Sequence, residues 1–252
     1  MRQWYNKIIP GLEDYVQTIL VLDNSAPPEP EDLPVFTNGM PALLCTSQNN
    51  HHRLTLFGNS VHAERLTIVD EITQIAIFFK PFAIGPVFRL SASELKNGPV
   101  ELNNWSPQKA IALNLQLIHA QSLEETIEAL LHFVLTEALS NQRECEVIKF
   151  ATDKILENPD NDVLAQLLQD LNLSARTFQR VFKKYVGISA NEYRRICQFQ
   201  IAFYQLRGKQ FDKLTDVAYD NGYFDQSHYI RSFREFTEIT PHEYLQYGLK
   251  KK

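Results

Sequence analysis

The stretch that decides the fold is Ser174-Ala-Arg-Thr-Phe-Gln-Arg-Val-Phe-Lys-Lys-Tyr-Val-Gly-Ile-Ser-Ala-Asn-Glu-Tyr193. Its first part predicts a helix, because four apolar side chains recur at the i, i+3, i+4 and i+7 spacing of one helix face. These are Phe178, Val181, Phe182 and Tyr185. Ser174 is suited to cap the first turn and Gly187 to end the helix. Ser189 and Glu192 then form a capping box, which starts another helix.

The opposite face of this predicted helix is cationic and carries no acid. It comprises Arg176, Thr177, Gln179, Arg180, Lys183 and Lys184. Most basic helix faces are simply solvated surfaces of a helical domain. The alternative is a recognition helix, which packs by its aromatic face and presents Arg, Gln and Thr to a DNA major groove. Taken alone, the stretch favours the solvated surface.

The same pattern returns 51 positions later, in residues 225–244. Asp225 takes the capping place of Ser174, and Thr240 with Glu243 rebuilds the capping box. A short apolar helix is expected before each copy, over 163–171 and 214–222, with Gly222 at the second turn. Helix, tight turn and second helix make a helix-turn-helix unit. A connecting helix near 191–207 would place the two recognition helices about 34–36 Å apart, one turn of DNA.

Residues 145–246 resemble the DNA-binding domain of the AraC/XylS family of bacterial transcription regulators. The resemblance rests on three runs: Leu173 to Lys184, Val217 to Phe233, and Ile239 to Tyr244. It implies seven helices and two helix-turn-helix units that enter successive major grooves. The chain departs from the family in two places. Leu167 stands where the second unit has Ala218, and Ile230 stands where the family often has a small polar residue. We therefore expect the second recognition helix to contact bases less directly than the first.

These motifs predict a set of DNA contacts. Arg176 and Arg180 share one helix face and are expected at guanine edges, whereas Lys183 and Lys184 are better placed for phosphate. For Arg180 and its counterpart Arg231, the alternative is a structural ion pair on the domain surface. The full predicted DNA-binding set is Arg176, Thr177, Gln179, Arg180, Lys183, Lys184, Gln226, Ser227, His228, Arg231 and Arg234.

Charge is divided unevenly along the chain, whose formal net charge is −5. Residues 1–140 carry 8 Lys and Arg against 15 acids, and residues 141–252 carry 17 against 15. Affinity for phosphate follows local charge. The C-terminal part is only mildly basic, so its cations must be concentrated on one face if it binds DNA.

The sequence shows no sign of catalysis, a cofactor, a metal site or export. Nucleophile-elbow and phosphate-loop motifs are absent, and the three cysteines, Cys45, Cys145 and Cys197, are too scattered for a disulfide framework or a zinc site. The N-terminus lacks an export signal, and no apolar run has the length of a membrane span. We expect a cytoplasmic regulator that is not an enzyme. The rival hypothesis is a small-molecule-binding or enzymatic β-barrel whose helical C-terminus binds other proteins.

The first domain, predicted over residues 1–140, is rich in strands, so the fold class is α+β. Short strands are expected at 16–22, 42–45, 54–57, 65–69 and 73–79, with a short helix over 91–96. They predict a cupin-like barrel or a sandwich. Residues 79–95 resemble an uncharacterised β-rich domain found ahead of this DNA-binding domain. His51, His52 and His62 are the only group of histidines in this half. Because the adjacent His51 and His52 would point to opposite faces of a strand, we do not expect them to form a metal site.

Residues 106–140 are expected to be helical, with starts at Ser106-Pro107 and at the capping box Ser122 to Glu125. The second of these helices carries a broad apolar stripe: Leu123, Ile127, Leu130, Leu131, Val134, Leu135 and Ala138. It would pack against the barrel or form a homodimer, and the sequence favours neither. A polar linker, 141–144, leads to the second domain, predicted over 145–252. The expected partners are double-stranded DNA, a small apolar or aromatic effector, and RNA polymerase if the protein is an activator.

Overall fold

A computed structural model of the chain describes residues 8–22, 40–49, 51–59, 72–140 and 146–249, together with the backbone of 2–5. The side chains of 93, 96, 97 and 247–249 lie outside this description. The N-terminal half contains one antiparallel sheet in the order β1-β2-β5-β3-β4-β6. Its strands are β1 (Arg2–Tyr5), β2 (Val16–Leu22), β3 (Ala42–Gln48), β4 (His51–Phe57), β5 (Thr73–Phe79) and β6 (Val100–Glu101).

The described strands form one antiparallel sheet, as the α+β fold class requires, and the cupin-like barrel or sandwich stays a prediction. Strands β1 and β6 are the two edges of this sheet and do not pair with each other. The strands predicted at 16–22 and 73–79 are confirmed, and those at 42–45 and 54–57 extend into a longer hairpin, β3 and β4. The strand predicted at 65–69 lies outside the described residues.

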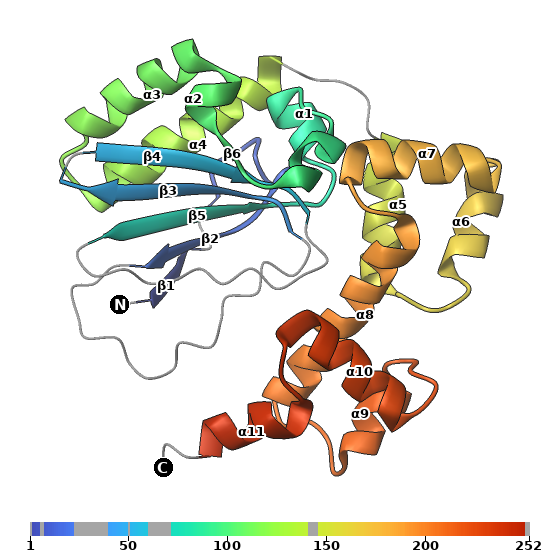
Figure 1. Cartoon of the computed structure of the whole chain (residues 1–252). Helices are drawn as coiled ribbons and strands as arrows, with labels where there is room; N and C mark the ends of the chain where they lie inside the picture. The colour runs from blue at the N-terminus through green and yellow to red at the C-terminus, as the bar shows by residue number, and fades with distance from the viewer. Residues whose placement is uncertain are drawn as a thin grey trace.

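Helices cover one face of this sheet (Figure 1). The covering helices are α3 (Pro107–His119) and α4 (Leu123–Ser140). Three short helices precede them in the chain: α1 (Ile84–Phe88) and a 3₁₀ helix η1 (Ala92–Asn97) lie between β5 and β6, and α2 (Leu102–Trp105) follows β6. The apolar stripe of α4 lies in the same buried cluster as Leu43, Ile75 and Ile77. The packing interpretation of that stripe is therefore confirmed. On the other face of the sheet a separate cluster holds Leu20 and Phe78.

The histidine pair behaves as strand alternation predicts. His51 is exposed on β4, whereas His52 is half-buried and lies 2.7 Å from the Ser47 hydroxyl through its Nδ1 atom. Burial lowers the pKa of His52, and the neighbouring His51 lowers it further. Among the described residues no group of His, Cys, Asp and Glu is arranged to hold a metal ion. His62 lies outside them.

Seven helices follow in residues 146–249, as the family resemblance implied. They are α5 (Glu146–Glu157), α6 (Val163–Asp170), α7 (Ala175–Val186), α8 (Ala190–Arg207), α9 (Leu214–Asp220), α10 (Gln226–Thr237) and α11 (Pro241–Leu249). Both predicted capping boxes are present. The Ser189 N–H donates to Glu192 at 2.7 Å, and the Thr240 N–H donates to Glu243 at 2.7 Å. No helix in the described parts of the chain is both long and apolar enough to cross a membrane.

The core of this second domain is aromatic, and its two halves repeat each other. Phe178 and Phe182 of α7 are buried with rings 5.6 Å apart, and Tyr229 and Phe233 occupy the same places on α10 with rings 5.9 Å apart. The repeat differs by one hydroxyl. Tyr229 is fully buried, and its oxygen has no hydrogen-bond partner among the described residues. Burial also raises the pKa of this phenol.

Replacing Tyr229 with Phe, the residue of the first copy, is expected to raise the free energy of unfolding by about 1 kcal/mol. A buried hydroxyl without a partner costs about 1–3 kcal/mol, and the ring itself is kept. Urea unfolding of the full chain measures the change. The equivalent Phe178→Tyr substitution is the matched control and should destabilise. A loss of stability in Tyr229→Phe would show that the hydroxyl has a partner, such as a bound water.

The two domains pack against each other. Phe82, from the segment before α1, is 2% exposed and belongs to the buried cluster of the helical domain rather than to that of the sheet. Its ring lies 6.4 Å from Tyr15. Lys149 on α5 forms an ion pair with Asp14, and this hydrogen bond lowers the pKa of the Asp14 carboxyl. Figure 1 shows the end of α7 beside α1, so the contact reaches the first helix-turn-helix unit.

Candidate nucleic-acid interface

The first helix-turn-helix unit consists of α6, the turn 171–174 and α7. The turn closes when the Leu173 N–H donates to the Leu168 carbonyl at 3.2 Å, with Asn172 left-handed at φ 48°. This is the hydrogen bond of a Schellman ending. Ser174 then caps α7, since its hydroxyl accepts from the Thr177 N–H at 3.3 Å. The predicted cap is confirmed, and it fixes the direction in which α7 leaves the turn.

The second unit consists of α9, the turn 221–225 and α10. Its turn closes with the same type of hydrogen bond, one position earlier than the 51-residue repeat would place it. The Tyr223 N–H donates to the Ala218 carbonyl at 3.0 Å, and Gly222 is left-handed at φ 70°, as predicted. Asp225 caps α10 by accepting from the His228 N–H at 2.6 Å. Because α9 ends one residue earlier than α6, the turn gains Phe224, whose side chain is 86% exposed.

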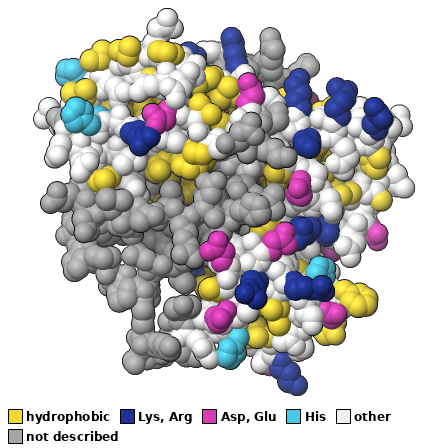
Figure 2. Space-filling view, in the orientation of Figure 1, with side chains coloured by type: hydrophobic (Ala, Val, Ile, Leu, Met, Phe, Trp, Pro, Cys, Tyr) yellow, Lys and Arg dark blue, Asp and Glu magenta, His cyan; other side chains and the backbone are white. Residues whose placement is uncertain are grey.

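On α7 the buried aromatic face leaves the cationic face outside. Arg176, Arg180, Lys183 and Lys184 are exposed, and Thr177 and Gln179 are half-buried beside them. Figure 2 shows Lys and Arg side chains gathered over the part of the molecule where α7 lies. Four of the six residues predicted on this helix thus form one exposed basic surface.

On α10 the predicted residues divide into two groups. Ser227, Arg231 and Arg234 are exposed, and Gln226 is half-buried. His228 is engaged with the turn instead: its Nδ1 lies 3.5 Å from the Phe224 N–H, and its ring packs edge-on against Tyr223 at 5.3 Å. The other predicted residues of α10 are therefore better oriented for contact with DNA than His228.

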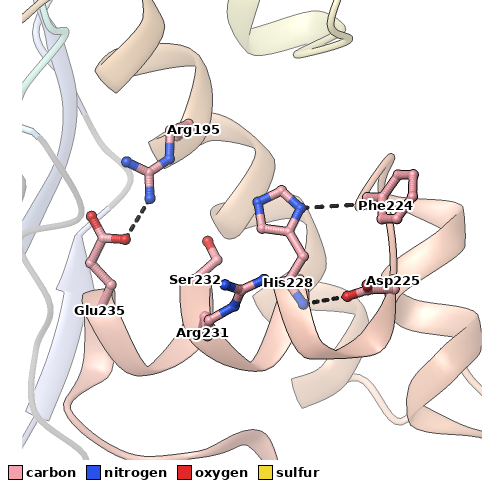
Figure 3. A pocket seen from close by; sticks show the side chains of 7 residues that line it. All are labelled: Arg195, Phe224, Asp225, His228, Arg231, Ser232 and Glu235. Atoms are coloured by element: carbon pink, nitrogen blue, oxygen red, sulfur yellow. Dashed lines mark hydrogen bonds and ion pairs between the residues drawn. The ribbon is translucent and has the colours of Figure 1, made fainter.

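An open depression of about 500 Å³ lies beside α10 (Figure 3). Its lining residues are Arg195, Phe224, Asp225, His228, Arg231, Ser232 and Glu235. Arg195 comes from α8 and forms an ion pair with Glu235 across the depression. Arg195 and Phe224 were missed from the sequence, because the pairing of α8 with α10 is tertiary and the extra turn residue has no counterpart in the first unit.

The two units differ in charge. Residues 163–186 contain four Lys and Arg against one acid, whereas residues 214–237 contain two against four. In Figure 2 the surface around the second unit accordingly mixes Lys and Arg with Asp and Glu. Attraction to phosphate depends on local charge. The first unit is therefore expected to attract DNA phosphates more strongly than the second.

Neither Arg180 nor Arg231 forms an ion pair within the described part of the chain. The only polar contact recorded there for Arg231 is a long bond, 3.4 Å, from its Nε to the Ser227 carbonyl of the same helix. Structural pairing is instead performed by Arg195. The arrangement leaves both arginines available for contact with DNA, whether to a base or to a phosphate.

Helix α8 separates the units. It has 18 residues, which corresponds to about 27 Å of helix. Figure 1 shows α7 near the first part of α8 and α10 near its later part. Two capped recognition helices on one helical connector define the class of protein: a helix-turn-helix DNA-binding protein with two units.

Comparison with known proteins agrees with this class. Residues 167–247 match the helix-turn-helix domain family, and residues 9–101 match a domain of unknown function (DUF6597). The C-terminal part of the chain therefore carries a helix-turn-helix domain, the kind of domain that the two capped units define.

Individual relatives are distant. An uncharacterised HTH-type transcriptional regulator of Haemophilus influenzae is 28% identical over 91 residues, 36% of this chain, and the match spans only 30% of that regulator's length. Among solved structures, ToxT of Vibrio cholerae bound to (E)-4-(8-methylnaphthalen-1-yl)but-3-enoic acid is similar with a TM-score of 0.46 and 11% identity, covering 98% of each chain. Wild-type ToxT bound to an unsaturated fatty acid has a TM-score of 0.39 and 14% identity, covering 84% of this chain and 88% of ToxT.

Proposed function

We propose that this protein is a sequence-specific, DNA-binding transcription regulator whose helices α7 and α10 enter successive major grooves. The observation that carries the proposal is the exposed cationic face of α7, which lies directly opposite the buried Phe178 and Phe182. A recognition helix needs this division, because one face must pack on its domain while the other meets bases and phosphates. The repeat of the unit in α9 and α10 supports it.

The rival class, a ligand-binding or enzymatic barrel with a helical protein-binding domain, is disfavoured. The helical domain matches the helix-turn-helix domain family and carries two capped recognition helices. A regulator that contacts the chromosome acts in the cytoplasm, and we propose that location.

The proposal is tested by selecting duplexes from a random pool with the full chain and titrating the best one with salt. The logarithm of the affinity should fall linearly with that of the salt concentration, because each neutralised phosphate releases counterions. Lys184→Ala should weaken all sequences alike and reduce the slope by about 1. Lys209→Ala is the control, since Lys209 follows α8 and is not among the predicted contacts. Failure to recover any duplex, or an affinity independent of salt, would refute DNA binding.

Two finer proposals concern partners of the N-terminal domain. Helix α3 exposes Ile111, Leu115 and Ile118 along one stripe, by 60, 55 and 46%, and we propose that homodimerisation buries this stripe. Light scattering of Leu115→Glu, which should stay monomeric, tests it.

We also propose a small apolar or aromatic effector, which should raise the melting temperature of the full chain. Stabilisation only by divalent metals would contradict it. As an activator, the protein would also contact RNA polymerase.

A further inference from the structure

The end of the first recognition helix is capped from the other domain. The last four carbonyls of a helix have no partner inside the helix. In α7, the Lys183 carbonyl accepts from the Gly187 N–H at 2.9 Å. The next partners come from the sheet domain: the Ser91 hydroxyl donates to the Lys184 carbonyl at 3.3 Å, and the Asn59 amide donates to the Val186 carbonyl. The same Asn59 amide donates to the Pro81 carbonyl at 2.9 Å, so it ties α7 to the segment before α1.

The contact between the two domains also explains why the residue that ends α7 is a glycine. Gly187 and its counterpart in the second unit, Glu238, are both left-handed, at φ 87° and 64°. Glu238 shows that this turn accepts a side chain. At Gly187, however, an added Cβ would lie 2.9 Å from the Ala92 carbonyl oxygen and 3.2 Å from the Ala92 Cβ. Glycine at 187 is therefore needed for the close approach of η1 as well as for the turn.

At the end of the second recognition helix, the backbone and hydroxyl hydrogen bonds found within the described residues are local. The Glu238 N–H donates to the Arg234 carbonyl at 2.8 Å, and the Thr237 hydroxyl bonds to the Phe233 and Ile239 carbonyls at 2.7 and 2.9 Å. All these groups belong to the helical domain itself. The two copies of the duplicated unit thus differ in one respect, namely that only α7 is shown to be closed by the sheet domain.

We infer that Ser91 and Asn59 are positioning residues for DNA recognition: the sheet domain caps α7 and sets the place of this helix relative to the groove. The inference rests on the proposed function. The cap supports binding and does not block it, because Arg176, Arg180, Lys183 and Lys184 all remain exposed while the contact is made. A change in the sheet domain that moves η1 reaches the end of α7 directly, so the first unit is the one placed for regulation from that domain.

The test uses the full chain with Ser91→Ala, Asn59→Ala and the double substitution. Amide hydrogen exchange without DNA should be about 3- to 10-fold faster at residues 185–187 in the double variant, and unchanged at the end of α10, because each lost hydrogen bond contributes modestly to local stability. Ser122→Ala is the matched control. Ser122 also caps a helix, accepting from the Glu125 N–H at 3.1 Å, but within the sheet domain. Ser91→Thr keeps the hydroxyl and should restore the exchange rate.

The DNA arm uses the tightest duplex that the unmodified chain recovers from a random pool of sites about 30 base pairs long, enough for two grooves. The double variant should bind it about 3- to 10-fold more weakly and select a broader sequence only at the base pairs contacted by the first unit. Faster exchange in α7 with unchanged affinity and selection would overturn the positioning role while DNA binding stands. Unchanged exchange would overturn the cap itself. If the unmodified chain selects no duplex, the proposed function fails and the inference fails with it, whatever the exchange arm shows.

Discussion

Replacing Arg180 with alanine is expected to weaken specific DNA binding by about 1–3 kcal/mol, about 5- to 150-fold, and to relax the base preference at one position. Arg180 is exposed on the first recognition helix, one turn from Arg176 and on the same face. Its guanidinium can donate two hydrogen bonds to the O6 and N7 atoms of guanine. Loss of that pair removes discrimination as well as charge. Selection from a random pool with each variant measures both.

Two matched variants separate base contact from phosphate contact. Arg180→Lys keeps the charge but lacks the planar fork, so it should also lose the base preference while it retains most of the salt dependence. Arg231→Ala changes the equivalent residue of the second unit, where Asp225 and Glu235 lie nearby, and should have a smaller effect. If Arg176→Ala and Arg180→Ala fold normally and select the same sequence as the unmodified chain, the first unit does not contact bases directly.

The helical domain was predictable because its signals are local. Ser174 caps the N–H of Thr177, and Ser189 exchanges hydrogen bonds with Glu192; each pair is three residues apart. The buried Phe178 and Phe182 follow from helical periodicity. An internal repeat doubles such signals, since each cap found in one copy tests the other.

The architecture of the sheet domain was not predictable in the same way. Most strands could be located from alternation, yet β5 lies between β2 and β3, and that order depends on pairing between distant segments. Whether a sheet stays open or closes into a barrel also depends on the helices that pack on its faces. The stripe on α4 was visible in the sequence, but only the structure shows that it packs on the sheet. The contact between Asn59 and Val186 joins residues 127 apart, and no periodicity encodes it.

Phe82→Ala is expected to lower the free energy of unfolding by about 3–5 kcal/mol, the usual cost of removing a buried phenylalanine ring. That is a large fraction of the total stability of a domain, about 5–15 kcal/mol. Phe82 belongs by sequence to the sheet domain but is buried in the core of the helical domain, in the same cluster as Ile148 and Val186. Both domains should therefore lose stability together.

Two probes distinguish the domains in the full chain. Both tryptophans, Trp4 and Trp105, lie in the first domain, so fluorescence during urea unfolding follows that half, and amide exchange of α5 follows the other. Phe82→Ala should lower the fluorescence midpoint and also speed exchange in α5. Phe78→Ala is the matched control, because Phe78 is likewise 2% exposed but lies on the sheet face within the first domain. It should lower the midpoint and leave exchange in α5 unchanged. Unchanged exchange in α5 of Phe82→Ala would show that the two domains are energetically independent.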